Sequence, residues 1–264
     1  GDPIPISAET GRNIGDLLTL VIQRFPPPDE TEDDDAIKVA IIGRPNVGKS
    51  SLVNALVGEE RVIVSEVPGT TRDAVDIPFT HQGRSFLLID TAGMRRRKRV
   101  KDPVEYYSVV RAVRAVERSD VALVMLDATE LVTEQDKKVA GIPHEAGKGV
   151  VIVVNKWDAV EKDAQTMKRM EERVRTELAF LPYAPIIFIS ALTGRRVADV
   201  LDLVEMVANN HAHRIPTGRL NEWLKEAILR RQPPSVKGKQ GRIYYAPQVS
   251  VKPPHFVFHV NDKD

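Results

Sequence analysis

The chain contains 264 residues, with a net charge of +1 at pH 7 and no cysteine. The length allows more than one domain, and the near-zero net charge excludes a protein whose whole surface attracts an oppositely charged partner. The absence of cysteine excludes disulfides and thiolate metal sites and suits a reducing compartment. No apolar run reaches membrane-spanning length, and the first residues lack the pattern of a secretory signal, so we expect a cytoplasmic protein with no membrane span.

A short segment near the start of the chain occurs again in its second half. Residues 6–12 read ISAETGR and residues 189–195 read ISALTGR, and a leucine-rich helical pattern follows each of them. Such self-similarity indicates two copies of one domain type, of which only the end of the first is present. We therefore interpret residues 1–25 as the C-terminal remnant of a first domain. Residues 26–36, with three prolines and an acidic run, are interpreted as a linker.

Residues 37–213 alternate apolar strand patterns with helical patterns. We predict strands over 37–42, 75–80, 85–89, 121–126, 150–154 and 186–189, and helices over 50–57, 103–118, 134–146, 164–180 and 197–210. Because the strands are nearly continuous in Val, Ile and Leu, both faces of the sheet should be covered. This predicts an α/β domain with a mostly parallel sheet, helices on both faces, and one antiparallel edge at the turn of Gln82 and Gly83.

Residues 214–264 have a different composition. They hold a helical pattern over 219–231, followed by β-rich runs over 242–250 and 255–260. This predicts a small α+β domain, which is incomplete in this chain.

The sequence from Gly43 to Ser50, GRPNVGKS, follows the first predicted strand and opens the first predicted helix. This is the context that a phosphate-binding loop requires, because glycines let the backbone N–H groups surround the phosphates at a helix N-terminus. Lys49 should contact the β- and γ-phosphates, and Ser50 should bind Mg²⁺. The expected nucleotide-binding residues of this loop are Asn46, Val47, Gly48, Lys49, Ser50 and Ser51.

The sequence Asn155-Lys156-Trp157-Asp158 follows a later strand and indicates which base is bound. The Asp158 carboxylate can accept hydrogen bonds from guanine N1–H and the exocyclic amine, a donor pair that adenine lacks. Asn155 would brace the loop, and the Lys156 stem would cover the base. After the next strand, Ser190, Ala191 and Leu192 should complete the base site, with a backbone N–H near guanine O6.

Two further segments belong to the same ordered set. Asp90 ends a strand and is expected to lie in the second coordination shell of Mg²⁺. The Gly93 N–H is expected to contact the γ-phosphate. A threonine of the polar loop 68–73 should close over Mg²⁺ when GTP is bound. In many small GTPases a glutamine after the glycine orients the attacking water, but here the position is Met94. Hydrolysis is therefore either slow or assisted by the backbone and another positive charge.

Residues 43–51, 69–73, 90–94, 155–158 and 190–191 together resemble the second GTPase domain of the Der (EngA) family. These bacterial proteins have two GTPase domains and act in building the large ribosomal subunit. Residues 1–25 resemble the end of the first GTPase domain, and residues 214–264 resemble part of the C-terminal KH-like domain. The resemblance therefore covers almost the whole chain.

The resemblance implies a GTPase that binds GTP, GDP and Mg²⁺ and whose hydrolysis is stimulated by K⁺. It implies Asn46 as a K⁺ ligand, Thr71 as the Mg²⁺ threonine and Thr70 near K⁺. Lys49, Thr71 and Gly93 are then the expected catalytic residues. The implied partners are the large ribosomal subunit with its rRNA, and the chain's own first GTPase and KH-like domains.

Two alternative functions and two basic or glycine-containing segments remain to be weighed from the sequence. A potassium-dependent GTPase of tRNA modification shares the Gly-Thr-Thr-Arg-Asp loop, and a nucleotide-sensing scaffold would have negligible turnover. The basic run 95–99 is either a solvated loop or a nucleotide-gated RNA contact. The segment 238–241 has the spacing of a Gly-x-x-Gly RNA clamp but precedes a strand, so we do not interpret it as one.

Overall fold

The computed structural model describes residues 35–58, 62–64, 76–91, 104–233, 235–236 and 239–261. All of these except Asp35 belong to one compact unit, Ala36–Asp264. The predicted remnant 1–25 and nearly all of the predicted linker lie outside the described residues.

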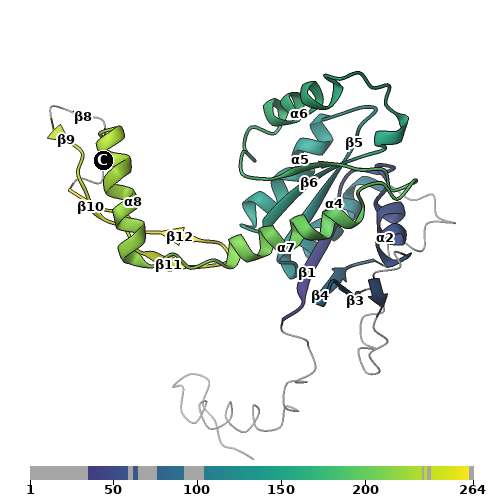
Figure 1. Cartoon of the computed structure of the whole chain (residues 1–264), viewed down its shortest axis with the longest axis horizontal. Helices are drawn as coiled ribbons and strands as arrows, with labels where there is room; N and C mark the ends of the chain where they lie inside the picture. Colours follow the sequence, from purple (N-terminus) through teal and green to yellow (C-terminus); the bar gives the residue numbers. More distant parts are fainter. Residues whose placement is uncertain are drawn as a thin grey trace, which may run out of the picture. The chain divides into compact units, whose positions relative to one another are not determined.

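A seven-stranded sheet forms the centre of the first part of this unit (Figure 1). Its order is β2-β3-β4-β1-β5-β6-β7, and the pairs β4–β1, β1–β5, β5–β6 and β6–β7 are parallel. The strands are β1 (Ile37–Ile42), β2 (Val62–Val64), β3 (Ile77–His81), β4 (Arg84–Ile89), β5 (Val121–Asp127), β6 (Gly149–Asn155) and β7 (Ile186–Phe188).

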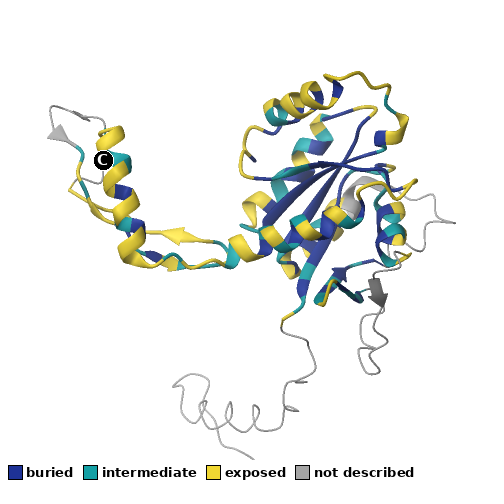
Figure 2. Cartoon of the chain, viewed as in Figure 1, coloured by how far each residue is buried: buried dark blue, intermediate teal, exposed yellow. Residues whose placement is uncertain are grey.

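Helices cover both faces of this sheet, as its apolar strands predict. Every residue of β5 and β6 is buried, and Figure 2 shows these strands buried beneath the helices. One core cluster joins the sheet to α2 (Lys49–Gly58) and α7 (Ala198–Ala212). The cluster on the other face includes α4 (Val104–Arg118), α5 (Glu134–Glu145) and α6 (Thr166–Glu177). The predicted α/β fold is confirmed.

The antiparallel edge of the sheet differs from the prediction by one strand. Gln82 and Gly83 both have positive φ, 50° and 79°, which is the conformation of a tight hairpin turn, and β3 and β4 pair antiparallel as predicted. β2 then pairs antiparallel with β3, so the edge has two antiparallel pairings rather than one. With only three residues, β2 is too short for a periodic pattern to predict it.

The ends of the helices follow local signals. α5 begins at a capping box, in which Thr133 and Asp136 satisfy each other's backbone N–H groups. α6 ends at Glu177, earlier than predicted, because Leu178 leaves the helical conformation at φ −108° and ψ 44°. Leu181 and Ala184, in the loop that follows, are buried in the core.

The C-terminal part has α8 (Thr217–Arg230) and short two-stranded sheets. β10 (Ile243–Tyr245) pairs with β13 (His259–Val260), and β11 (Gln248–Ser250) pairs with β12 (His255–Phe256). Each predicted β run is therefore two short strands. The small core of this part contains Leu220, Leu224 and Ala246.

The segment 238–241 contains the strand β9 (Lys239–Gln240), which pairs antiparallel with β8 (Ser235–Val236). Residues 239 and 240 thus belong to a pair of short strands. Among the described residues, no helix is both long and apolar enough to cross a membrane.

Candidate nucleotide-binding site

The loop between β1 and α2 can form only because two of its residues are glycines. Gly43 has φ +152°, and a Cβ at this position would lie 2.7 Å from the Met125 carbonyl oxygen. Gly48 has φ +100°, and a Cβ there would lie 2.2 Å from Asn155 Nδ2. Both values are shorter than any real Cβ contact, so the backbone approaches its neighbours more closely than another residue allows.

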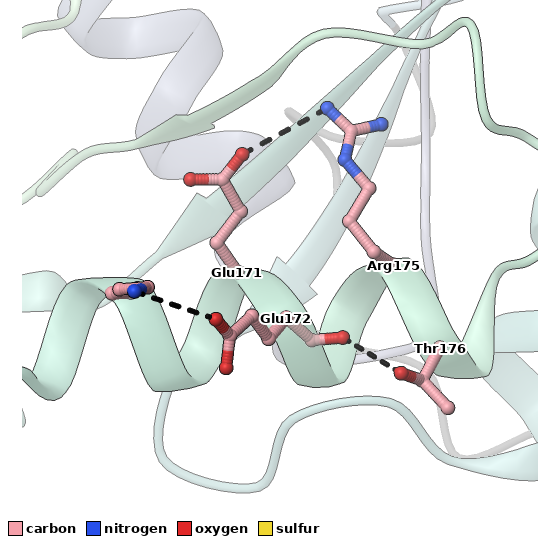
Figure 3. A pocket seen from close by; sticks show the side chains of 5 residues that line it. Glu171, Glu172, Arg175 and Thr176 are labelled. Atoms are coloured by element: carbon pink, nitrogen blue, oxygen red, sulfur yellow. Dashed lines mark hydrogen bonds and ion pairs between the residues drawn. The ribbon is translucent and has the colours of Figure 1, made fainter.

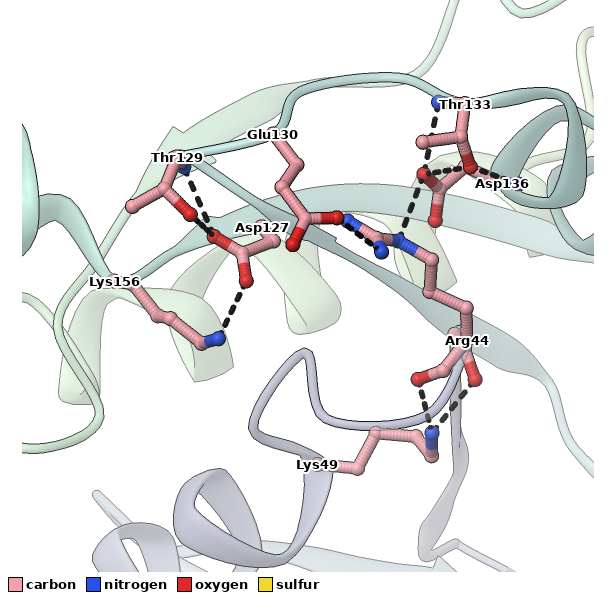
Figure 4. A network of polar contacts seen from close by, with 9 residues as sticks. Arg44, Lys49, Asp127, Thr129, Glu130, Thr133, Asp136 and Lys156 are labelled. Carbon is pink, nitrogen blue, oxygen red and sulfur yellow. Dashed lines mark hydrogen bonds and ion pairs between the residues drawn. The ribbon is translucent and has the colours of Figure 1, made fainter.

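Lys49 begins α2 and its side chain folds back over the loop. Its Nζ donates hydrogen bonds to the carbonyl oxygens of Gly43, at 2.6 Å, and Arg44, at 2.8 Å (Figure 4). Ser50 and Ser51 follow in the first turn, which contains no acidic residue. A helix N-terminus of this kind presents unpaired N–H groups and a positive dipole end, and both favour an anion.

Asn155, at the end of β6, links three of the predicted segments. Its Nδ2 donates to the Val47 carbonyl oxygen at 2.9 Å, and its Oδ1 accepts from the Ala191 N–H at 2.9 Å. Asn155 is 3% exposed. One buried amide therefore holds the phosphate loop and the two base-side loops together.

The residues after Asn155 hold Asp158 at the surface. Lys156 has a left-handed backbone with φ 64°, and the buried ring of Trp157 packs against Phe188 with centroids 4.8 Å apart. The backbone N–H of Trp157 also donates to the Ile189 carbonyl oxygen at 3.0 Å. Asp158 is exposed, and no described residue bonds its carboxylate. It is thus available to a ligand.

The loop after β7 faces the same site. Ser190 is buried, and its Oγ accepts from the Thr193 N–H at 3.1 Å. The Ala191 N–H already donates to Asn155, whereas no described residue pairs with the N–H of Leu192. The Leu192 side chain is 84% exposed.

Asp127, at the end of β5, fixes the side chain of Lys156. Asp127 Oδ2 accepts from Lys156 Nζ at 2.5 Å, and Oδ1 accepts from the N–H of Thr129 at 2.9 Å and its hydroxyl at 2.7 Å (Figure 4). Burial raises the pKa of the Asp127 carboxyl, but the hydrogen bonds from Lys156 and Thr129 outweigh it and lower the pKa. The carboxylate therefore stays ionised and holds the ammonium.

Arg44 extends from the phosphate loop to the start of α5. Its Nη1 pairs with Glu130 at 2.5 Å and its Nε with Asp136 at 3.2 Å (Figure 4). Burial lowers the pKa of Arg44, but the hydrogen bond to Glu130 and the charge of Asp136 outweigh it and raise the pKa.

Asp90 follows β4 and has a left-handed backbone with φ 55°. Its N–H donates to Asp76 Oδ1 at 2.9 Å, and Asp76 also pairs with Arg118. No described residue donates a hydrogen bond to the Asp90 carboxylate. Burial raises the pKa of this carboxyl, and the charge of Arg111 opposes the shift.

Several predicted residues lie outside the described residues. They are Thr70, Thr71, Gly93, Met94 and the basic run 95–99. The catalytic and potassium roles that involve them therefore remain predictions.

Two hollows on the surface of the described residues bear on the site. One of about 510 Å³ lies between α2 and the loop after β7, and it is lined by Ser51, Asn54, Ala55, Gly58, Ala191, Leu192 and Gly194. It adjoins the first turn of α2 at Ser51 and the base-side loop at Ala191 and Leu192. The other is lined by α6 residues alone, whose charges pair along the helix (Figure 3). Because no polar groups from other elements converge there, we assign it no role.

Sequence reasoning missed four residues of this site: Arg44 as a side chain, Asp76, Asp127 and Asp136. Each acts through a contact with a residue distant in sequence. The capping-box pattern of Thr133 and Asp136 was a detectable signal for one of them.

Known proteins match the chain over both of its described parts. A family described as 50S ribosome-binding GTPases matches residues 38–156, and one described as the KH-domain-like C-terminal part of EngA bacterial GTPases matches residues 214–264. A protein named GTPase Der from Pelotomaculum thermopropionicum is 58% identical over 265 residues, which cover 100% of this chain and 60% of the relative. GTPase Der from Moorella thermoacetica is 60% identical over 261 residues, which cover 99% of this chain and 60% of the relative.

The chain thus spans about 60% of the length of these curated relatives. Among solved structures, the translation elongation factor SelB from Methanococcus maripaludis, in complex with the GTP analogue GppNHp, is similar with a TM-score of 0.50. It is 23% identical, and the match covers 69% of this chain and 35% of that one. This likeness concerns the fold alone.

Proposed function

This chain belongs to the Der (EngA) family of GTPases, and from that premise we propose that its described site binds GTP and GDP and hydrolyses GTP. The observation that carries the proposal is the buried Asn155 amide, which joins the phosphate loop at Val47 to the base-side loop at Ala191. A phosphate-binding loop and a base-recognition loop are thereby held as one site.

We assign the base contacts to residues around this amide. The exposed Asp158 carboxylate accepts from guanine N1–H and the exocyclic amine, and the Lys156 stem, held by Asp127, covers the base face. The free N–H of Leu192 lies in the loop assigned to guanine O6, next to the N–H of Ala191 that bonds Asn155. An adenine base would leave the Asp158 carboxylate without its donors.

The phosphate contacts follow from the loop and the start of α2. Lys49 supplies a positive charge, and the N–H groups from Asn46 to Ser51 surround the β-phosphate side. Mg²⁺ would be held by the Ser50 hydroxyl and, through water, by Asp90, whose carboxylate no described residue bonds. When bound, this ion neutralises charge on the phosphate oxygens.

For catalysis, we propose a mechanism that does not depend on a glutamine. Met94 cannot orient a water molecule, so the attacking water relies on backbone groups such as the Gly93 N–H and on positive charge. We propose K⁺ at Asn46 as that additional charge, with slow hydrolysis in its absence. Asn46 is exposed with a left-handed φ of 67°, so its side chain is accessible from solvent.

The biological setting is also a proposal, because the chain spans only part of its relatives. We propose that nucleotide state controls binding to the large ribosomal subunit and its rRNA, and that the protein acts in the cytoplasm. The match to a family described as 50S ribosome-binding GTPases supports this setting.

The base assignment is tested by Asp158→Asn. Hydrogen bonds to a charged group contribute about 1.5–3 kcal/mol, so GTP binding should weaken roughly 10- to 150-fold. Xanthosine triphosphate should bind better to the variant, because its C2 carbonyl can accept from the new amide. Glu161→Gln, an exposed change in the same loop, is the matched control and should leave both affinities unchanged. Unchanged GTP affinity in Asp158→Asn would remove the basis for guanine recognition.

A further inference from the structure

The structure assigns Arg44 as a positioning residue that holds the phosphate loop through Asp136 at the N-terminus of α5, an inference that rests on the proposed function. Arg44 is the second residue of the loop. Its side chain points away from Lys49 and contacts Glu130 and Asp136 of the β5–α5 segment (Figure 4).

The partner of Arg44 is a carboxylate that cannot turn to solvent. The Asp136 side chain is 0% exposed and that of Arg44 is 14% exposed, whereas the second partner, Glu130, is 58% exposed. Asp136 Oδ1 and Arg44 Nε and Nη2 are all buried without a hydrogen-bond partner among the described residues, so Arg44 and Asp136 meet as an ion pair at 3.2 Å. The Asp136 carboxylate depends on this charge, and a buried pair is strongly perturbed when one partner is removed.

Asp136 is itself held in place. Its Oδ2 accepts from the Thr133 N–H at 3.0 Å and the Thr133 hydroxyl at 2.8 Å. Behind it, Val139 and Ala140 of α5 pack in the core against the sheet. The anchor to which Arg44 binds is thus a fixed helix end.

The backbone carbonyl of Arg44 faces the other way, toward Lys49. Its carbonyl oxygen accepts from Lys49 Nζ at 2.8 Å, and the preceding carbonyl, of Gly43, accepts at 2.6 Å. Lys49 is the residue that reaches the β- and γ-phosphates in such loops. A shift of Arg44 therefore displaces the ammonium that meets these phosphates, and leaves the α-phosphate and base contacts in place.

This reasoning predicts an effect that depends on the number of phosphates. In Arg44→Met, which removes the charge but keeps the length, affinity for GDP and GTP should fall about tenfold, or about 1.4 kcal/mol. Affinity for GMP should change less than about twofold, because GMP has no β-phosphate. A small misplacement of reacting groups lowers the rate by up to about a hundredfold. In Arg44→Met, kcat should therefore fall by a larger factor than KM rises.

The experiment measures GDP, GTP and GMP by competition against a fluorescent GDP, on the full chain. The variants are Arg44→Met, Asp136→Asn, the double variant, and Arg44→Lys, which keeps the charge but cannot bridge both carboxylates. Arg169→Met, which removes the exposed pair with Asp163 and a 3.4 Å hydrogen bond to the Thr166 hydroxyl, is the control and should bind as the wild type does. If Arg44 and Asp136 act as one pair, the double variant should bind GDP no more weakly than Arg44→Met alone.

Each outcome bears on the inference. If Arg44→Met loses GMP affinity as much as GDP affinity, or if the two single losses add, Arg44 contributes general stability and not phosphate-loop position. If Arg44→Met does not fold, Arg44→Lys gives the same comparison, with a smaller loss expected for GDP and none for GMP. A wild-type chain that binds no guanine nucleotide refutes the proposed function itself. If the wild type binds guanine nucleotides and the variants bind them with the same affinities, only the positioning role is refuted.

Discussion

Replacing Asn155 by alanine would remove the single side chain that joins the phosphate loop to the base-side loop. The change leaves the Val47 carbonyl oxygen and the Ala191 N–H, both bonded at 2.9 Å in the protein, without partners in a buried region. A buried polar group without a partner costs about 1–3 kcal/mol, so the two groups cost about 2–6 kcal/mol. Because water can enter the space that the amide leaves, we expect a loss of about 2–4 kcal/mol in the free energy of unfolding.

Equilibrium urea unfolding without nucleotide measures this loss directly. A loss of this size leaves most domains folded, so GDP affinity can be measured on the same variant and should fall more than tenfold. Asn209→Ala, an exposed change on α7, is the matched control and should unfold as the wild type does. If Asn155→Ala unfolds within about 0.5 kcal/mol of the wild type, the bridge is not a stabilising element and our account of the site is wrong.

Three further predictions follow from particular contacts. Gly48→Ala should lower stability by at least about 1 kcal/mol and abolish GDP binding, because φ is +100° and a Cβ would lie 2.2 Å from an amide nitrogen; Gly141→Ala, in open helical space, should instead raise the thermal midpoint. Burial lowers the pKa of His211, whose Nδ1 has no partner among the described residues, so protonation disfavours the folded state. Stability should be full above about pH 6.5 and fall below it by at most about 1.4 kcal/mol per pH unit; His211→Gln, which can still donate to the Gly147 carbonyl, should flatten this slope, and identical profiles would exclude the effect. Asn46→Ala should abolish the stimulation of GTP hydrolysis by KCl over NaCl while sparing GDP affinity, and stimulation that persists would remove Asn46 as a K⁺ ligand.

The central sheet could be predicted from the sequence because its signals are local. β1 was predicted with its observed ends, and β5 and β6 to within one residue at each end, since continuous Val and Ile runs indicate strands buried on both faces. β2 could not be predicted, because three apolar residues fit a strand, a helix or a loop equally well. Its place is set by the β3 strand with which it pairs, and pairing is a tertiary contact.

The residues of the candidate site fall into two groups, those that the sequence predicts and those that only tertiary contacts reveal. Residues that would touch the nucleotide belong to short contiguous patterns, which the sequence displays. The contacts that hold these residues in place join loops that follow different strands, as in the pairs Arg44–Asp136 and Asp127–Lys156. The sequence around one member of such a pair does not indicate which residue the other member is. The sequence therefore predicts the groups that would bind the nucleotide better than the groups that hold them in position.

The contact between Gly48 and Asn155 explains why the ordered set of patterns is more specific than any of its members. Gly48 must lack a side chain because Asn155 Nδ2 occupies the space where its Cβ would be, and that same nitrogen binds the carbonyl oxygen of Val47. The other end of the amide binds Ala191, in the third segment. A glycine-rich turn or an Asn-Lys-x-Asp sequence that arose alone would have no partner for these groups. Each of the three patterns therefore needs the other two, because all three meet at one buried amide. This is the physical reason that the patterns, in their order along the chain, identify a single site.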